Sequence, residues 1–259
     1  MMKVGVIGAS GRMGRETCAT ILAAQDMELV FGVDHKNSGN PVAGTDLRLT
    51  NDLAGELART KPDAVVDFTH PSSAAAHAVD ALRTGSIPII GTSGLSDSAL
   101  EAVRNASNDT GLPALYIPNF AIGAVLMMKF AAEAAKHLPE AQIIEMHHDR
   151  KVDAPSGTAI RTAELIASNR TRPPKQPATE VIKVDGAVGG TYRDTPIHSV
   201  RLPGLVAHQL VLFGGPGEVL TIRHDSLDRT SFMQGVLLAL RKCKSLTGLV
   251  IGLENLLDN

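Results

Sequence analysis

The densest group of reactive side chains lies at residues 145–158, which read Glu-Met-His-His-Asp-Arg-Lys-Val-Asp-Ala-Pro-Ser-Gly-Thr. Two adjacent histidines, His147 and His148, can exchange a proton near neutral pH. Lys151 follows them and can donate a proton or bind a carboxylate. A proton donor beside a cation indicates chemistry on an acidic small molecule.

The end of the same segment adds a second feature that favours an anion. Ser156, Gly157 and Thr158 stand where the apolar periodicity predicts that a helix begins. The first turn of a helix carries unpaired backbone N–H groups and the positive end of the helix dipole. We therefore expect this segment to bind an acidic ligand close to the histidines.

Three other interpretations of this segment stay open on sequence grounds. Glu145, His147 and Asp149 alternate and could ligate a metal from one strand face, although no Cys or His pattern elsewhere supports a metal and we predict none. Ser156 could act as a nucleophile with a histidine base, but the Gly-x-Ser-x-Gly pattern is absent. The run could also be a solvated loop that only leads into the next helix.

A second chemical signal lies near the N-terminus, where Gly8, Gly11 and Gly14 follow a predicted strand and open a predicted helix. Glycine permits positive φ and lets a ligand approach the backbone, and the start of a helix offers N–H groups to a pyrophosphate. The spacing differs from the commoner Gly-x-Gly-x-x-Gly. We predict a dinucleotide-binding loop; the alternative is a tight strand-to-helix turn without a ligand.

The acidic residue Asp34 supports a dinucleotide at this loop. It ends the second predicted strand, about twenty residues after Gly14, where an acid can accept hydrogen bonds from the adenosine ribose hydroxyls. An acid at this position favours NADH, whereas the basic neighbours His35 and Lys36 could face the 2′-phosphate of NADPH. The expected cofactor is therefore NADH, NADPH or both.

Two further turns follow predicted strands. They are Asp-Phe-Thr-His at residues 67–70 and Gly-Thr-Ser-Gly at residues 91–94. Ligands of open parallel sheets bind at the carboxyl ends of the strands, and small or hydroxyl-bearing residues suit contacts to ribose or nicotinamide. Either turn alone is also typical of an ordinary loop.

The elements that position these residues alternate regularly over the first 120 residues. Short apolar runs predict strands at 3–7, 28–33, 63–68, 87–90 and 114–117. Helical patterns occupy 12–24 and 97–105, and another helix begins at Pro71. This alternation predicts a parallel sheet with helices on both faces.

The pattern changes after residue 118. Helices are expected at 123–137, 157–167 and 229–242, with a strand at 142–146 and a proline-rich exposed loop at 169–177. Further strands are expected at 181–184, 197–202, 209–213 and 219–223, without long helices between them. These runs predict a mixed or antiparallel sheet in a second domain.

Composition narrows the function classes. Lys plus Arg is 25 and Asp plus Glu is 27, so the formal net charge is −2. The chain lacks the basic excess of a nucleic-acid or anionic-membrane binder, and no apolar run reaches membrane-spanning length. Cys18 and Cys243 are too few for a disulfide scaffold and form no CxxC pair. With no secretory signal at the N-terminus, we expect a cytoplasmic protein.

The sequence resembles the dihydrodipicolinate reductase family of the bacterial lysine pathway, also called 4-hydroxy-tetrahydrodipicolinate reductases. The resemblance runs in order through residues 8–14, 67–69, 91–94, 119–120, 145, 147–148 and 151–159, whereas Asp149 and Arg150 depart from it. It implies an α/β fold with a Rossmann-type parallel-sheet domain, residues 1–118 plus 229–259, that binds the dinucleotide. An inserted α/β domain with a mixed sheet, residues 119–228, would bind substrate and join the chains into a homotetramer.

The resemblance also implies a reaction. A hydride would pass from NADH or NADPH to a cyclic intermediate formed from 4-hydroxy-tetrahydrodipicolinate, with loss of water, to give tetrahydrodipicolinate on the diaminopimelate and lysine pathway. By resemblance, His147 is the proton donor, and Lys151 is a second donor or a carboxylate anchor. The substrate-binding positions are His148, Ser156, Gly157 and Thr158.

The same resemblance assigns a larger set of residues to the cofactor. These are Gly8, Ala9, Ser10, Gly11, Arg12, Met13, Asp34, His35, Phe68, Thr69, Gly91, Thr92, Ser93, Pro118, Asn119, Phe120 and Ala121. His70 stands where some members carry Arg, and Asp34 followed by His35 favours NADH without excluding NADPH. Two alternative functions are another small amino- or hydroxy-acid dehydrogenase and a dinucleotide-sensing binding protein, although a sensor needs no proton donor.

Overall fold

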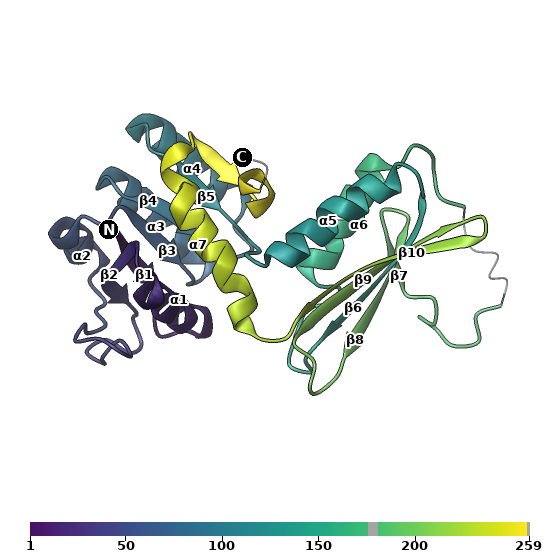
Figure 1. Ribbon diagram of the computed structural model, residues 1–259, viewed down its shortest axis with the longest axis horizontal. Coiled ribbons are helices and arrows are strands. Elements are labelled where there is room, and N and C mark those ends of the chain that lie inside the picture. The colour runs from purple at the N-terminus through teal and green to yellow at the C-terminus, as the bar shows by residue number, and fades with distance from the viewer. Residues whose placement is uncertain (176–180, 258–259) are drawn as a thin grey trace. The chain divides into compact units, whose positions relative to one another are not determined.

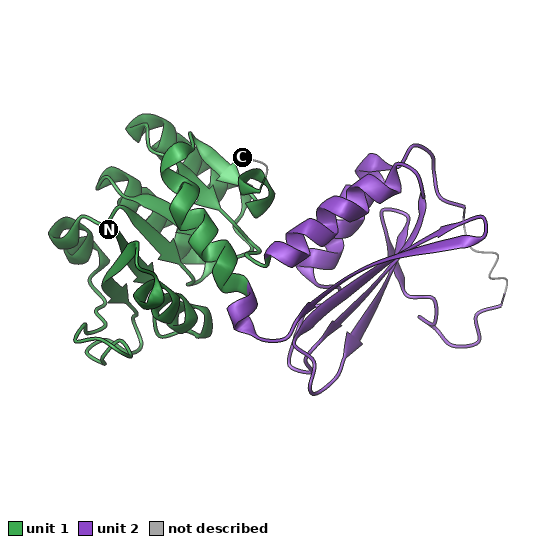
Figure 2. Cartoon of the chain, viewed as in Figure 1, with its two compact units in different colours: residues 1–121, 232–259 green, residues 122–231 purple. Residues whose placement is uncertain are grey.

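The computed structural model describes residues 1–175 and 181–257. The chain divides into two compact units, coloured separately in Figure 2. Unit 1 comprises Met1–Ala121 and Phe232–Asn259, and unit 2 comprises Ile122–Ser231. The assignment of dinucleotide binding to the first domain, and of substrate binding and tetramerisation to the second, stays a prediction.

Unit 1 is built on a six-stranded parallel sheet in the order β11-β5-β4-β3-β1-β2 (Figure 1). The strands are β1 (Met2–Ile7), β2 (Met27–Val33), β3 (Ala64–Asp67), β4 (Ile87–Ile90), β5 (Ala114–Tyr116) and β11 (Leu249–Ile251). The strand order reverses between β1 and β3. Ligands of such sheets bind outside the carboxyl ends of the strands at this switch point.

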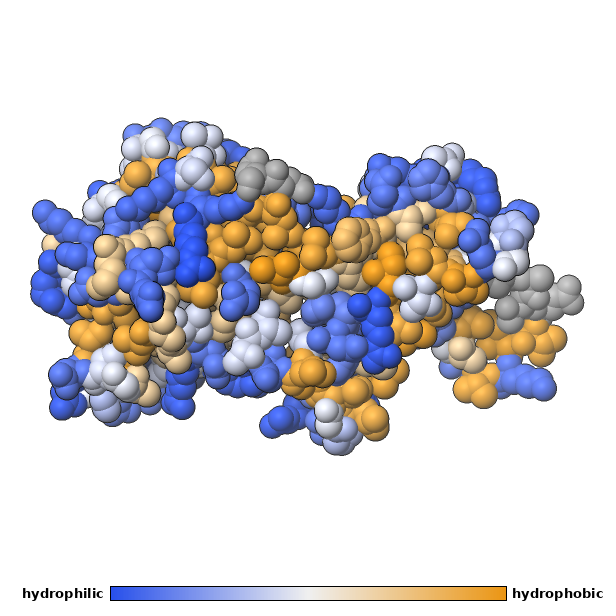
Figure 3. All heavy atoms as spheres, in the orientation of Figure 1, coloured by the Kyte–Doolittle hydropathy of each residue, from blue (hydrophilic) through white to orange (hydrophobic). Residues whose placement is uncertain are grey.

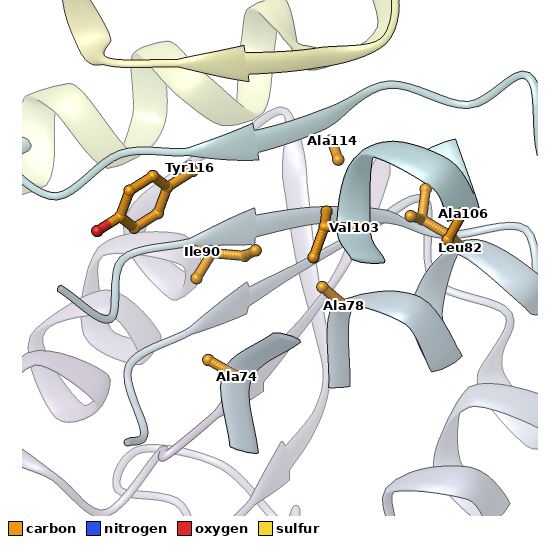
Figure 4. Packing of buried hydrophobic residues seen from close by; sticks show 8 residues of the cluster. All are labelled: Ala74, Ala78, Leu82, Ile90, Val103, Ala106, Ala114 and Tyr116. Carbon is orange, nitrogen blue, oxygen red and sulfur yellow. The ribbon is translucent and has the colours of Figure 1, made fainter. Parts of the chain in front are cut away.

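Helices cover both faces of this sheet, because its central strands are apolar on both sides. They are α1 (Arg12–Ala23), α2 (Leu53–Thr60), α3 (Pro71–Arg83), α4 (Asp97–Thr110) and α7 (Met233–Lys242). Figure 4 shows α3 and α4 packed on β4 and β5 through small alanines and a few larger side chains. The alanines let the helix backbones approach the sheet closely.

Unit 2 has a five-stranded mixed sheet in the order β10-β9-β6-β8-β7, in which only β6 and β8 are parallel neighbours. The strands are β6 (Glu140–His147), β7 (Gly190–Tyr192), β8 (Thr195–Arg201), β9 (Ala207–Gly215) and β10 (Glu218–Ser226). Helices α5 (Ile122–Ala135) and α6 (Gly157–Asn169) cover one face. Ile143, Ile197, Val211 and Phe213 are buried beneath them.

The predicted fold class is confirmed: a Rossmann-type parallel sheet and a second domain with a mixed sheet. Several details differ. Helix α4 continues to Thr110 because Gly111, at φ +70°, ends it in a left-handed cap. Helix α2 has eight residues and strand β11 has three, and the sequence analysis missed both. In the described part of the chain, no helix is long and apolar enough to cross a membrane.

The strand predicted at 181–184 is wrong. Val181, Ile182 and Val184 are exposed and belong to no strand, and turns follow at residues 183–188. Their β-branched side chains resemble a strand, but no neighbouring strand pairs with them. The helix predicted over 229–242 is divided into a 3-10 turn, Arg229–Phe232, and α7. In the loop predicted at 169–177, α6 still includes Asn169, residues 170–175 form no helix or strand, and 176–177 lie outside the described residues.

Candidate active site

The glycine loop joins β1 to α1 in the form that the sequence analysis predicted. Gly8 has φ +78°, and a Cβ there would come 2.7 Å from the carbonyl oxygen of Phe68. A Cβ on Gly14 would come 2.1 Å from the oxygen of Gly8. Helix α1 begins after Gly11, and no side chain of the described residues caps its first turn. A loop backbone without side chains at these glycines, together with the amides at the start of α1, fits a pyrophosphate.

Asp34 is fixed against this loop. Its Oδ2 accepts hydrogen bonds from the backbone N of Ser10 at 3.2 Å and from the Ser10 hydroxyl at 2.6 Å. The amide of Asn37 donates to the same hydroxyl at 2.7 Å. Burial raises the pKa of Asp34, but the hydrogen bonds outweigh burial and leave the pKa below its usual value. The carboxylate is therefore charged and already oriented beside the loop.

A cavity of about 380 Å³ adjoins Asp34 and its partners. Ser10 and Asn37 supply polar atoms to its wall, and Val42, Leu49 and Ala19 supply apolar surface. A partly open space with apolar and polar groups on its wall suits a flat aromatic base. The cavity thus fits the adenosine half of a dinucleotide whose pyrophosphate lies on the glycine loop.

Asp67 joins the two other predicted cofactor turns. Its side chain is buried, at 3% exposure, and Oδ1 accepts hydrogen bonds from the Thr69 hydroxyl at 2.6 Å and the Thr92 hydroxyl at 3.0 Å. The ring Nδ1 of His77, on α3, lies 2.7 Å from Oδ2. This carboxylate holds the turns at 67–70 and 91–94 together at the switch point. The sequence analysis assigned no role to His77.

Three predicted cofactor residues also meet at this edge of the sheet. The rings of Phe68 and Phe120 form an edge contact with centroids 5.6 Å apart. A Cβ on Gly91 would come 2.2 Å from the Phe68 ring and 2.8 Å from the Phe120 ring, so only glycine fits there. Of the remaining predicted positions, Ala9 and Ala121 are buried, Met13 and Asn119 are half-buried, and Arg12, His35, Ser93 and Pro118 are exposed.

The reactive segment of unit 2 begins on β6, where Glu145 is fully buried. Its Oε2 lies 2.5 Å from Nδ1 of His147 and accepts a hydrogen bond from Nη1 of Arg201 at 3.0 Å. Its Oε1 accepts from Nη2 of Arg201 at 2.8 Å and from the backbone N of Ser156 at 3.3 Å. The carboxylate therefore binds a histidine, an arginine on β8 and the start of α6.

The electrostatics of Glu145 follow from these contacts. Burial by itself raises the pKa of the carboxyl group, but the hydrogen bonds from His147 and Arg201 outweigh it and lower the pKa to about 2. The group is a carboxylate at neutral pH. The sequence analysis considered Glu145 only as a metal ligand, and it missed Arg201, because an arginine at the end of a strand carries no signal until the sheet brings it beside β6.

The loop between β6 and α6 holds the other predicted residues. Nζ of Lys151 pairs with the carboxylate of Asp153, at 2.7 and 2.9 Å. The hydroxyl of Ser156 caps α6 by accepting from the backbone N of Ala159 at 3.2 Å. A Cβ on Gly157 would meet nothing within 4 Å, so the first turn of α6 is open to a ligand. His148 and Thr158 are half-buried.

This geometry bears on two of the alternatives raised by the sequence. Ser156 is buried and its hydroxyl is engaged as a helix cap, which does not suit a nucleophile. The carboxylate of Glu145 binds His147 and Arg201, so its oxygens are already used and do not suit a metal site shared with Asp149. Within residues 1–175 and 181–257, no group of three or more His, Cys, Asp or Glu side chains is placed to hold a metal.

Comparison with known proteins identifies the family. The family model described as "Dihydrodipicolinate reductase, N-terminus" matches residues 2–120, and the one described as "Dihydrodipicolinate reductase, C-terminus" matches residues 123–257. A protein of Syntrophomonas wolfei named 4-hydroxy-tetrahydrodipicolinate reductase is 48% identical, and the match covers 98% of each chain. A protein of the same name from Moorella thermoacetica is 47% identical, over 99% of this chain and 98% of that relative.

Solved structures agree with this assignment. Dipicolinate-bound dihydrodipicolinate reductase from Paenisporosarcina sp. TG-14 superposes with a TM-score of 0.90 at 42% identity, over 99% of this chain and all of that chain. An amine dehydrogenase from Mycobacterium smegmatis, at 12% identity and a TM-score of 0.68, shares the fold alone. The chain belongs to the dihydrodipicolinate reductase family.

Proposed function

We propose that this protein reduces 4-hydroxy-tetrahydrodipicolinate to tetrahydrodipicolinate, with a reduced nicotinamide dinucleotide and loss of water, on the diaminopimelate and lysine pathway. One observation carries the proposal. The buried Glu145 fixes His147 beside a loop that holds a lysine and the open N-terminus of α6. This arrangement suits a dicarboxylate that must also gain a proton, and the named relatives support the substrate.

His147 is the proposed proton donor. Its Nδ1 faces Glu145, so Nε2 is the ring atom left to carry a proton to the substrate. The reaction takes up one hydride and one proton and releases the 4-hydroxyl group as water. When it is bound, the reduced nicotinamide supplies the hydride. General acid catalysis by a positioned histidine contributes roughly 10²–10⁴-fold to the rate.

The substrate carboxylates are assigned to two cationic features of unit 2. Lys151 exchanges its partner Asp153, which is 54% exposed, for one carboxylate of the substrate. Gly157 and Thr158, in the first turn of α6, bind the other near the positive end of the helix dipole. His148 and Ser156, whose hydroxyl caps α6, complete the substrate-binding positions. The dipicolinate bound to the Paenisporosarcina relative, a planar dicarboxylate, supports this assignment.

The residues around the glycine loop would hold the cofactor, and we propose a preference for NADH over NADPH. The amides of α1 bind the pyrophosphate, and Asp34 accepts from the ribose hydroxyls. A charged carboxylate at this place repels a 2′-phosphate. The exposed His35 and Lys36 reduce that repulsion, so NADPH remains a slower reductant.

We also propose a cytoplasmic homotetramer that assembles through the sheet of unit 2. The face of this sheet opposite α5 and α6 carries Ile144, Met146, Leu210 and Leu212, all only partly buried. Apolar residues reach the surface of both units in Figure 3, and Val200 and Val219 are exposed on this face. An apolar sheet face of this kind suits contact with another copy.

The proposed reaction is tested by following oxidation of NADH and of NADPH at 340 nm. The substrate is generated fresh by the synthase that precedes this step. Oxidation that depends on the substrate and is faster with NADH is the expected result. Folded protein that binds NADH but oxidises neither nucleotide would overturn the reductase and leave another dehydrogenase or a sensor. Size-exclusion chromatography with light scattering tests the tetramer.

A further inference from the structure

We propose that Glu145 and Arg201 are positioning residues for the proton donor. Arg201 fixes the buried carboxylate of Glu145, and that carboxylate accepts from Nδ1–H of His147, so that Nε2 is the atom that takes up a proton from solvent and, as part of the imidazolium, delivers it to the substrate. The inference rests on the proposed function, in which His147 donates the proton.

The sheet itself brings these groups together. Glu145 and His147 are two residues apart on β6, so both side chains point to the face that α5 and α6 cover. In the parallel pairing with β8, His147 is the register partner of Arg201. The guanidinium reaches back to Glu145 through both terminal nitrogens, at 3.0 and 2.8 Å. This two-point contact fixes the plane of the carboxylate and hence the direction of its bond to His147.

Stability alone does not account for this pair. A carboxylate buried from water pays a large desolvation cost, and well-packed apolar residues in place of a buried ion pair are often neutral or stabilising. The register partners of Glu145, Ser199 on β8 and Gln209 on β9, are polar but uncharged, and the next inward pair of the sheet, Ile143 and Val211, is apolar. A charged residue at Glu145 is therefore best explained by the histidine it orients, because a buried carboxylate selects one tautomer and one ring orientation.

Arg201 also connects the histidine to the loop that carries Lys151. Its Nη2 donates to the backbone oxygen of Asp153 at 2.7 Å, and the backbone N of Ser156 donates to Glu145. One guanidinium–carboxylate pair thus holds the proton donor, the lysine loop and the start of α6 in a single arrangement. We expect its loss to disturb proton transfer first and substrate binding second.

A double-variant cycle tests whether Glu145 acts through His147. Glu145→Gln keeps the size of the side chain and removes its charge, and the amide can favour the wrong ring tautomer. We expect it to lower kcat by about 10²-fold or more, with little change in the Kd for NADH. In a His147→Ala background, the same change should alter the residual kcat by no more than about twofold. Wild-type kcat in Glu145→Gln, or effects that multiply in the double variant, would overturn the proposal.

Glu140→Gln is the matched control. Glu140 is the other glutamate on β6, but it pairs with Arg172 away from the histidines. We expect this variant to keep wild-type kcat and KM. Circular dichroism of every variant establishes that it is folded. Arg201→Lys, which keeps the charge and loses the two-point contact, should lie between wild type and Glu145→Gln in kcat.

A spectroscopic measurement separates this inference from the proposed function. In full-length protein labelled with ¹⁵N-histidine, His147 is identified by the resonance that disappears in His147→Ala. At a pH high enough for the ring to be neutral, we expect the Nδ1–H tautomer in wild type and its loss in Glu145→Gln but not in Glu140→Gln. This result would hold even if the enzyme reduced a different substrate. An Nε2–H tautomer in wild type, or no change in Glu145→Gln, would contradict the positioning role.

Discussion

Each unit buries a carboxylate near the end of a strand and beside a histidine, but the two carboxylates accept hydrogen bonds from different kinds of donor. Asp67 in unit 1 accepts from the hydroxyls of Thr69 and Thr92, and His77 lies on its remaining oxygen. Glu145 in unit 2 accepts from Arg201 through two nitrogens and lies against His147. Asp67 is held by neutral hydroxyl donors, whereas Glu145 is held by a permanent cation.

The difference corresponds to what each carboxylate organises. Asp67 ties together two turns that present backbone and small side chains, so neutral donors are enough. Glu145 orients a ring that must carry a proton, and an arginine that cannot lose its own proton keeps the carboxylate charged throughout.

The largest expected effect separates the two histidines. His147→Ala should lower kcat by roughly 10²–10⁴-fold, the usual contribution of a positioned general acid. His77→Ala should change kcat by less than about threefold, because it loosens a turn without removing a reacting group. Steady-state kinetics at saturating NADH measures both. Equal losses in the two variants would mean that both histidines serve structure and that His147 is not the donor.

The second comparison concerns stability. Arg201→Met leaves the Glu145 carboxylate buried without its cation and should destabilise the protein by about 3–5 kcal/mol. Thr92→Val removes one neutral donor from Asp67 and should cost only about 1 kcal/mol. Urea unfolding at one fixed protein concentration gives both values. In the double variant Glu145→Leu with Arg201→Met, stability should recover while activity stays lost; recovery of activity would contradict the positioning role.

Measuring the free energy of unfolding at several pH values tests whether the charge of Glu145 contributes to stability. The pKa of Glu145 in the folded protein is about 2, against an ordinary value of 4.5 for a glutamate side chain. The pKa is depressed on folding, so this group stabilises the fold fully above about pH 4.5 and loses that contribution as the pH falls towards 2. The stability of wild type relative to Glu145→Gln should therefore be constant near neutral pH and should fall as the pH drops from about 4.5 towards 2. A difference that does not depend on pH would show that the charge is not responsible.

The sequence predicted the parallel sheet and most of the cofactor edge, because both rest on local signals. Strand–helix alternation, the glycines of the loop and Asp34 are each readable within a short window. Glycine positions are informative because a side chain at Gly8 or Gly14 would meet backbone atoms. Strand β11 has only three residues, too few to produce a period, so its pairing with β5 defines it. Helix α2 does carry local signals, an apolar face and the N-cap Asp52, which the sequence analysis did not use.

The charged centre of unit 2 was only half predictable. His147 and Lys151 stand in one dense segment, so their chemistry is evident from composition. Arg201 lies more than fifty residues away and reaches Glu145 only through the parallel pairing of β6 with β8, which no local pattern specifies. The incorrect prediction of a strand at 181–184 also arises because the local sequence does not specify strand pairing. β-Branched residues indicate a strand only if a partner strand is available.

The smallest expected effect concerns the cofactor. Asp34→Ala should reduce the preference for NADH over NADPH in kcat/KM by about tenfold, or 1–2 kcal/mol, because it removes a carboxylate that repels the 2′-phosphate of NADPH. The effect is small because water, His35 and Lys36 screen that repulsion. Binding of both nucleotides should weaken, since Ser10 loses its partner. Asp46→Ala, an exposed acid in the following loop, is the matched control and should leave the ratio unchanged. An unaltered ratio in Asp34→Ala would mean that the basic neighbours, and not this acid, select the nucleotide.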